Sequence, residues 1–260
     1  TPAHTCRPAA RCSTRCRPGA SNSPPVATPT ESPSPRTHRP TLPQSYFTTA
    51  TFRFLHALDR NNSRDWFHAH KADYERHVRE PFLQLITDLQ TPLAKISPHY
   101  RADPRKNGGS LFRIFRDTRF SNNKLPYKPW QGSRFFHERR HEIPAPSFYM
   151  HIQPGDCFAG GGMWHPEPDA LKHIRGFLAD NPAAWKSATR SKAFRDHLQL
   201  GGDSLVRPPR GYDPAHELID DLKRKDFVAS AGFSEELACS GELLPWTVAT
   251  FKRVAPLVDY

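Results

Sequence analysis

The sequence predicts an α+β fold, in which N-terminal and C-terminal helices flank a central antiparallel sheet. Three observations lead to this prediction. Apolar residues recur at helical spacing soon after residue 45, a hairpin pattern lies near the middle of the chain, and helical spacing returns toward the end. Helical and strand segments therefore follow one another in blocks, whereas a parallel doubly wound sheet requires them to alternate.

Residues 1–45 differ in composition from the rest of the chain. They contain no aromatic residue, and Val26 and Leu42 are their only large aliphatic side chains. A segment this poor in apolar side chains cannot offset the conformational entropy that ordering would cost. We therefore expect a disordered tail rich in Pro, Ser, Thr and Arg, followed by one globular α+β domain over residues 46–260. An organelle transit peptide and an upstream translated segment are alternatives for the tail.

Composition also limits the location and the partners of the protein. The formal net charge of +11 at pH 7 is shared between the tail and the domain, so the total does not by itself indicate nucleic acid. Cys157 and Cys239 are widely spaced in a domain of ample size, which favours a reducing, cytoplasmic location over a disulfide framework. No stretch reaches the roughly 18 apolar residues of a membrane span, so no membrane contact is expected.

Helices are expected in the first third of the domain. From Thr51 the apolar side chains recur at three-residue intervals, at Phe52, Leu55 and Leu58. Ser63 is a suitable N-cap for a second helix, because its hydroxyl can accept a hydrogen bond from a free backbone N–H. Pro81 is expected to break or kink that helix, since proline lacks the helical donor. The helical spacing then continues to about Ile96.

The middle third is expected to form the antiparallel sheet. Residues 110–120 are rich in Phe and Ile and predict a strand, and residues 134–137 predict a second. Residues 147–153 and 156–164 are β-rich runs joined by Pro154-Gly155, a combination typical of a hairpin.

Helical spacing returns in the last third. Helices are expected after Pro168, over residues 182–188 and 191–198, and from about Leu243 to the end. Residues 215–225 predict an amphipathic helix with three side chains facing the core: Leu218, Ile219 and Leu222. A short strand is expected over residues 226–231.

The segment of residues 110–130 has the composition of a binding site. It holds five basic side chains among aromatic residues: Arg113, Arg116, Arg119, Lys124 and Lys128. Asp117 is its only acidic residue, and it is our candidate for a catalytic base if the protein is an enzyme. Guanidinium groups match the planar fork of carboxylate or phosphate, so the segment predicts a site for an anionic small molecule. The alternative is that Asp117 pairs with one arginine and the remaining basic side chains are solvated.

Two arginines outside this segment are expected to join the site. Arg64 follows Asn61-Asn62-Ser63 at the start of a helix. The free backbone N–H groups of that helix end can bind an anion, or the Asn and Ser side chains can simply cap the helix. Arg210 lies on a stiff Pro-rich loop, where it either contacts the ligand or packs with Tyr212 against the last helices. The predicted ligand-binding residues are Arg64, Arg116, Arg119, Lys124, Lys128 and Arg210.

Other chemical signals are weak. Residues 160–162 are three glycines, which indicate either a β-bulge or close approach of another backbone and lack the spacing of a nucleotide loop. The histidines of the middle third have no metal-ligand spacing, and the Cys and His residues of the tail lack a core to support zinc, so no metal site is expected. Glu75 and Asp156 are further possible acids or bases. Neither a nucleophile elbow nor a C-x-x-C pair occurs.

Four motifs occur in a recognisable order: Asn-Asn-x-Arg-x-Trp-Phe-x-x-His-Lys from residue 61, Phe-Arg-Asp-x-Arg-Phe-Ser-x-x-Lys-x-Pro-Tyr-Lys from residue 115, Gly-Gly-Gly-x-Trp-x-Pro from residue 160, and Gly-Asp-x-Leu-x-Arg-x-Pro-Arg-Gly-Tyr from residue 202. From Phe47 to Leu257 the chain thereby resembles a family of bacterial and fungal conserved hypothetical proteins, the domain of unknown function twenty-four sixty-one. The resemblance implies no particular activity or cofactor. It directs attention to the matching positions Asn62, Arg64, Trp66, Arg116, Asp117, Arg119, Ser121, Lys124, Tyr127, Lys128, Gly161, Gly162, Trp164, Arg207, Arg210 and Gly211. Asn123 stands where the family usually has an acidic residue, which argues against a mechanism that needs a carboxylate there.

Three functions are compatible with these observations. The first is binding of a phosphate- or carboxylate-bearing small molecule by the Arg/Lys cluster. The second is nucleic-acid binding, since the basic residues are interleaved with aromatic rings that can stack on bases. The third is a protein-interaction scaffold, which predicts a broad exposed apolar patch and no basic pocket.

Overall fold

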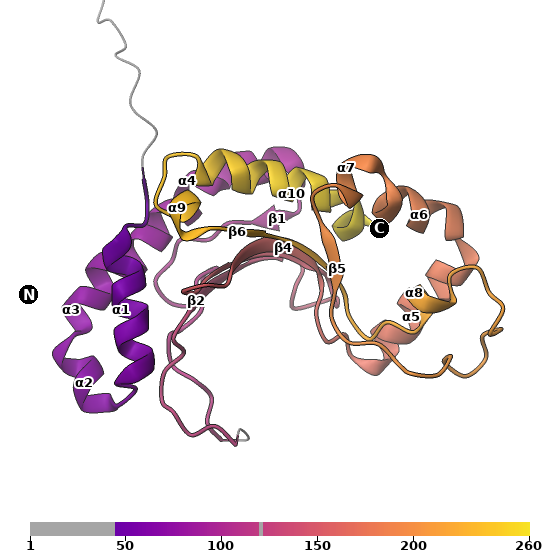
Figure 1. The fold of residues 1–260 in the computed structure, drawn as a ribbon. Coiled ribbons are helices and arrows are strands. Elements are labelled where there is room, and N and C mark those ends of the chain that lie inside the picture. Colours follow the sequence, from indigo (N-terminus) through magenta and orange to yellow (C-terminus); the bar gives the residue numbers. More distant parts are fainter. Residues whose placement is uncertain (1–44, 120–121) are drawn as a thin grey trace, which may run out of the picture. The chain divides into compact units, whose positions relative to one another are not determined.

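The computed structural model describes residues 45–119 and 122–260 (Figure 1). The described residues belong to one unit, Thr41–Tyr260. They form an antiparallel sheet with flanking helices, so the predicted α+β fold is confirmed. The expected disordered tail lies, except for Ser45, outside the described residues.

The sheet has six strands in the order β1-β2-β3-β4-β6-β5, and all neighbours are antiparallel. The strands are β1 (Tyr100–Arg101), β2 (Gln131–His137), β3 (Ser147–Ile152), β4 (Cys157–Met163), β5 (Gln199–Gly201) and β6 (Phe227–Phe233). The predicted hairpin is β3–β4. In its turn the N–H of Asp156 donates to the carbonyl of Gln153 at 3.1 Å, and Gly155 has φ +74°. Proline followed by a left-handed glycine is the sequence that a type II turn requires.

Helices precede β1, lie between β4 and β6, and follow β6. The N-terminal group is α1 (Thr49–Arg60), α2 (Arg64–Ala69), α3 (Lys71–Tyr74), the π-helical turn η1 (Glu75–Arg79) and α4 (Glu80–Ile96). The C-terminal group is α5 (Pro168–Asp180), α6 (Pro182–Arg190), α7 (Lys192–Arg195), α8 (Ile219–Leu222), α9 (Glu235–Ala238) and α10 (Leu243–Asp259). None of the helices in the described part of the chain is long and apolar enough to cross a membrane.

Pro81 explains the π-helical turn between α3 and α4. It lies in the first turn of α4 and has no N–H to donate to the carbonyl of His77. That carbonyl instead accepts a hydrogen bond from Thr51 Oγ1 at 2.7 Å, which connects α1 to the π turn. The predicted break at Pro81 is therefore present as a change of helical register, and the helix is interrupted a second time at His70.

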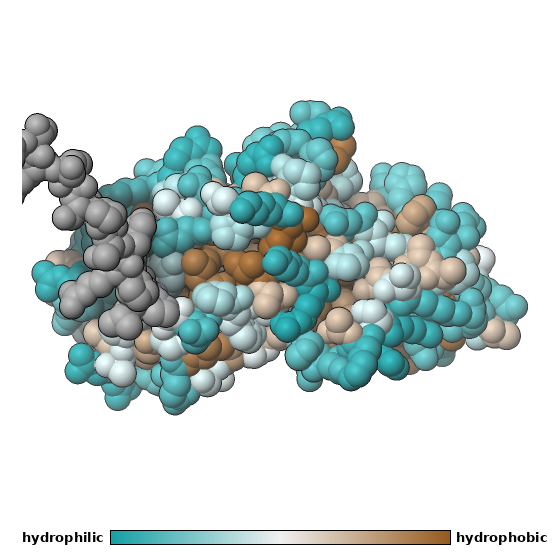
Figure 2. Space-filling view, turned by 90° about the horizontal axis from the view of Figure 1, so that it is seen from above, coloured by the Kyte–Doolittle hydropathy of each residue, from teal (hydrophilic) through white to brown (hydrophobic). Residues whose placement is uncertain are grey.

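One face of the sheet carries most of the core. In Figure 1, α4 and α10 lie together over this face, and Phe135 of β2 and Phe148 and Met150 of β3 are fully buried. The ring of Phe251 on α10 lies 5.4 Å from the ring of Phe135 and 5.0 Å from that of Phe148. Figure 2 shows the molecule from the side of these helices, where hydrophobic residues appear in a short band between hydrophilic surfaces.

The opposite face of the sheet is open in Figure 1. Because side chains alternate along a strand, Arg134, Tyr149 and Phe158 project from this face, and all three are half-buried. Arg134 on β2 pairs with Tyr149 on β3. Phe158 on β4 pairs with His151, which lies two residues after Tyr149 on the same face of β3. The sheet therefore has one face used for packing and one that remains accessible.

The three glycines of β4 mark a close backbone approach. The pairing of β4 with β6 runs without interruption from Cys157↔Phe233 to Met163↔Phe227, so these glycines form no bulge. A Cβ on Gly160 would lie 2.1 Å from the carbonyl oxygen of Ala229 on β6. No side chain fits at this distance.

Two predicted elements are wrong in their extent. Residues 110–120 do not form one strand, because the segment changes partner: Phe112 N–H donates to Gly132 O at 3.0 Å, whereas Arg116 N–H donates to Pro126 O at 2.9 Å. The helix predicted over residues 215–225 is reduced to α8. The imidazole of His216 accepts the N–H of Leu218 at 3.0 Å, which competes with helical hydrogen bonding.

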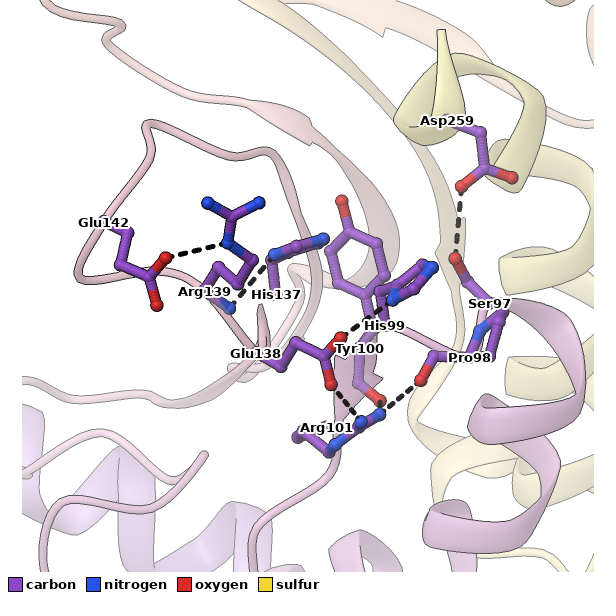
Figure 3. A network of polar contacts seen from close by, with 10 residues as sticks. All are labelled: Ser97, Pro98, His99, Tyr100, Arg101, His137, Glu138, Arg139, Glu142 and Asp259. Carbon is purple, nitrogen blue, oxygen red and sulfur yellow. Dashed lines mark hydrogen bonds and ion pairs between the residues drawn. The ribbon is translucent and has the colours of Figure 1, made fainter.

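Edge strand β1 is short and was not predicted. It pairs with the end of β2, and Glu138 beyond β2 forms a hydrogen bond with His99 and an ion pair with Arg101 on the β1 side (Figure 3). Nearby, the hydroxyl of Ser97 donates to Asp259 Oδ1 at 3.1 Å, which connects the end of α4 to the end of α10. These contacts hold the edge of the sheet under the two helices that cover it.

Candidate functional site

Asn62 fixes the start of α2 against the basic segment. Its side-chain amide donates to the carbonyl of Tyr127 at 3.0 Å, and its side-chain oxygen accepts the N–H of Tyr127, also at 3.0 Å. The rings of Tyr127 and Phe67 stack with their centroids 4.2 Å apart. Ser63 caps α2 as predicted, by accepting the N–H of Trp66 at 3.3 Å. Capping thus explains Ser63, whereas Asn62 joins two segments that are distant in the sequence.

A pocket of about 430 Å³ lies where these segments meet. Its lining residues are Arg64, His68, Phe115, Arg116, Thr118, Lys124, Pro126 and Tyr127. Three of the predicted ligand-binding residues, Arg64, Arg116 and Lys124, therefore come together. We call this the basic pocket. His68 also lines it and was missed, because its position on α2 matters only once Asn62 has placed that helix.

The charges of the basic pocket are not neutralised within the described residues. No carboxylate among them lies within 4.0 Å of the cationic groups of Arg64, Arg116 or Lys124. Lys124 Nζ donates to the carbonyl of Thr118 at 3.0 Å, which leaves its charge uncompensated. The Nε of Arg116 is buried and has no hydrogen-bond partner in the described structure. A buried donor without a partner is destabilising, and a bound water, ion or ligand can satisfy it.

The other three predicted residues lie elsewhere. Arg119 forms an ion pair with Asp117, with 2.7 Å between Nη2 and Oδ2. Lys128 Nζ donates to the carbonyl of Arg113 at 3.0 Å and lies 4.8 Å from the ring centroid of Trp130. Arg210 is exposed in the loop between β5 and α8 and does not line the basic pocket.

Asp117 has the properties of a stabilised anion. The hydrogen bonds from the side chain and the backbone of Arg119 lower the pKa of its carboxyl to about 2. Its side chain is 52% exposed, and it does not line the basic pocket. A carboxylate with so low a pKa accepts a proton poorly at neutral pH, which makes Asp117 a weaker base than an unpaired aspartate.

A second hollow, of about 490 Å³, lies on the open face of the sheet. Its lining includes six ring-bearing residues: Phe112, Trp130, Tyr149, His151, Phe158 and Trp164. We call it the aromatic groove. The sequence prediction missed it, although the alternation of Tyr149 with His151 on β3 was a usable signal. What the sequence does not show is which face of the sheet α10 covers.

His165 and Asp226 form an ordered pair next to this groove. His165 Nδ1 lies 2.9 Å from Asp226 Oδ1, and the backbone N–H of His165 donates to the same oxygen at 2.7 Å. Asp226 is fully buried and also accepts the N–H of Asp203 at 2.9 Å. Its first role is therefore to join two loops, and it orients the exposed imidazole as it does so.

The cysteines and potential metal ligands show no reactive arrangement in the described ranges. Burial raises the pKa of the Cys157 thiol to about 11, and burial also raises the pKa of Cys239. Both thiols are therefore protonated at neutral pH and weakly nucleophilic. Residues 45–119 and 122–260 contain no group of three or more His, Cys, Asp or Glu side chains that could hold a metal ion. The Cys and His residues of the tail fall outside these ranges.

Comparison with known proteins identifies the family of this chain. Neither the curated proteins nor the solved structures include a match to this chain. A protein-family model matches residues 50–260, which is nearly all of the described part and includes both the basic pocket and the aromatic groove. The resemblance inferred from the four motifs is thus confirmed, and the chain belongs to the family described as conserved hypothetical protein (DUF2461).

Proposed function

We propose that this protein binds a small phosphate- or carboxylate-bearing molecule in the basic pocket. The observation that carries the proposal is the buried Nε of Arg116, which has no hydrogen-bond partner among the described residues. Arg116 lines the pocket, so an anionic oxygen that reaches its Nε would satisfy this donor and neutralise the surrounding charge at the same time.

The residues of the pocket suit an oxyanion. Arg116 and Arg64 can each present a planar fork to two oxygens, and Lys124 adds a point charge that can adjust to the ligand. The rest of the wall consists of His68, Phe115, Thr118, Pro126 and Tyr127, and no acidic residue lines the pocket. The lower local dielectric beside these rings strengthens a charge-assisted hydrogen bond relative to one in water.

The size of the pocket favours a small molecule over a polymer. Small-molecule sites typically enclose about 300–1,000 Å³, and the volume of the basic pocket falls within that range. A nucleic-acid surface requires cations distributed along a path, whereas Arg119, Lys128 and Arg210 are each engaged or placed away from the pocket. Nucleic-acid binding and a scaffold role are therefore the alternatives to be tested.

The test is a thermal-shift and calorimetric titration of the protein with inorganic phosphate, pyrophosphate, sugar phosphates and citrate. Arg116→Gln should weaken binding of the best anion by roughly tenfold or more, because a charged hydrogen bond contributes about 1.5–3 kcal/mol. The matched control is Arg113→Gln, which removes the same charge from the same segment. Arg113 is exposed and does not line the pocket, so its loss should change affinity little.

The alternatives predict different outcomes. Binding of oligonucleotides that weakens steeply with salt, without any small-anion binding, would indicate a nucleic-acid module. Equal losses of affinity in Arg116→Gln and Arg113→Gln would mean that only the general positive charge of the segment matters. No stabilisation by any anion would leave the scaffold role in the stronger position.

A further inference from the structure

The aromatic groove has a wall made of neutral rings. The rings of His151 and Phe158 stack at 4.8 Å with an angle of 14° between their planes. Trp130 lies 4.7 Å from His151 on one side, and Tyr149 lies 5.7 Å from Phe158 on the other. These four rings come from two adjacent strands and from the residue that precedes β2, so the wall belongs to the rigid part of the fold.

Burial favours the uncharged form of the histidine in this wall. The hydroxyl of Tyr149 lies 2.9 Å from His151 Nδ1, and His151 Nε2 lies 3.1 Å from Gln153 Oε1. The side-chain oxygen of Gln153 can only accept, so Nε2 donates to it, and in the neutral ring Nδ1 accepts from the hydroxyl of Tyr149. Burial lowers the pKa of His151, which favours the same neutral form. A neutral aromatic wall offers stacking to a planar ring and does not itself attract an anion.

Glycines leave the floor of the groove without side chains. Gly160 and Gly162 lie on the open face, between Phe158 and the rim residue Trp164. At Gly162 a Cβ would lie 2.0 Å from the carbonyl oxygen of Phe227, so this position excludes any larger residue. A flat strip of backbone beside stacked rings is the shape that accommodates a planar ligand.

An arginine without an acidic partner stands at one end of the groove. Arg134 Nε donates to Ser147 Oγ at 2.8 Å, and its guanidinium lies 5.1 Å from the ring of Phe136. Within the described ranges, no carboxylate lies within 4.0 Å of it, and its two terminal nitrogens make no hydrogen bond. The guanidinium is thus oriented by two contacts, while the fork that binds oxyanions is unoccupied.

A second arginine extends this cationic end. Arg134 and Trp164 also line the adjacent hollow, of about 580 Å³, which reaches Arg140. The guanidinium of Arg140 lies 4.3 Å from the ring of Phe136, so both arginines lie near one ring. Their mutual repulsion is not relieved by any ion pair among the described residues, and an anion beside Phe136 would relieve it.

From this geometry we infer that the open face of the sheet is a second ligand site, which binds a planar aromatic ring carrying a carboxylate or phosphate group. The ring packs against the half-buried Tyr149 and Phe158 over the glycine floor, and the anionic group pairs with Arg134. The volume of the groove, about 490 Å³, fits a ligand of this size. The inference stands apart from the basic pocket, because the two sites share no residue.

The test is equilibrium binding of matched probes, followed by tryptophan fluorescence and confirmed by calorimetry. Adenosine monophosphate and 4-hydroxybenzoate each combine a ring with an anion. Adenosine and 4-hydroxybenzyl alcohol lack the anion, and inorganic phosphate and acetate lack the ring. We expect at least one combined probe to bind about tenfold or more tightly than both of its matched partial probes. The preferred probe distinguishes a phosphate from a carboxylate ligand.

Variants separate the two sites. Arg134→Gln and Phe158→Ala should each weaken the combined probe by about tenfold, whereas Arg116→Gln should leave it unchanged. Conversely, Arg134→Gln should leave the binding of ringless anions in the basic pocket unchanged. The proposal for each site can therefore be refuted without affecting the other. Arg134→Lys, which keeps the charge and loses the fork, should bind with intermediate affinity if Arg134→Gln proves unstable. Binding that ignores Arg134 and Phe158, partial probes that bind as well as combined ones, or no binding of any probe would overturn the inference.

Discussion

The two faces of the central sheet are built from the same strands and differ in what covers them. On one face Phe148 is fully buried against α10, while on the other Phe158 of the neighbouring strand remains half-buried beside a hollow. Large aromatic side chains occur on both. The difference shows that an aromatic residue in this sheet contributes mainly to stability where a helix covers it and is available for binding where none does.

The largest expected effect comes from the covered face. Phe148→Ala removes a fully buried ring that contacts Phe251 and Tyr100, and it should lower the free energy of unfolding by about 3–5 kcal/mol. Phe158→Ala removes a half-buried ring and should cost only about 1–2 kcal/mol. Urea denaturation of both variants measures the difference. Equal losses would contradict the division between a packed face and an open one.

Glycine substitutions in β4 test how the two faces are constrained. Gly160→Ala directs a Cβ onto the backbone carbonyl of Ala229, which cannot move without breaking the sheet, so it should cost about 3 kcal/mol. Gly161→Ala points to the covered face, where its Cβ would lie 2.9 Å from a methyl group of Val258. A side chain can shift, so this variant should cost about 1 kcal/mol. If Gly161→Ala is the more damaging, the packing on α10 is tighter than the pairing with β6.

The pH dependence of stability should report the neutral wall of the open face. In the unfolded chain the pKa of His151 is about 6.5, and burial lowers it in the folded protein. The unfolded state then binds more protons at mildly acidic pH, so stability is lost as the pH falls through this value. In His151→Gln, unfolding measured between about pH 7 and pH 5 should depend less on pH. An unchanged profile would mean that other groups dominate in this range.

The smallest effect is expected at Asp117. The ion pair with Arg119 is exposed, so Asp117→Asn should leave the melting temperature unchanged within error. The same substitution removes a negative charge near the basic pocket and should increase the affinity for anions slightly, as a titration with pyrophosphate would show. A loss of anion binding would instead give Asp117 a direct role in the site.

The parts of the fold that the sequence predicts well are those set by neighbouring residues. Pro154-Gly155 determines the β3–β4 turn, and Ser63 caps α2, because both act over a few positions. The strand predicted over residues 110–120 was wrong because its apolar composition does not reveal that the backbone changes partner from Gly132 to Pro126. Local pattern is thus informative about turns and caps, and much less so about pairing between distant segments.

The same distinction applies to the two sites. Arg116 and Lys124 are near in sequence, so their clustering could be predicted, whereas Arg64 reaches the pocket because Asn62 and Phe67 contact Tyr127. The aromatic groove could not be predicted from β3 and β4 alone. Its existence depends on α10, at the end of the chain, covering the other face of the sheet.

The most direct test of the basic pocket is to observe the Arg116 Nε–H group by NMR while pyrophosphate is added. The free donor of Arg116 should shift and saturate with pyrophosphate concentration, whereas the exposed Arg113 should respond weakly and without saturation. Arg116→Lys identifies the resonance. That result would place an anion at the one buried donor on which the proposed function depends. An Arg116 signal that stays unchanged while the protein binds pyrophosphate, or that follows all other arginines equally, would contradict the account.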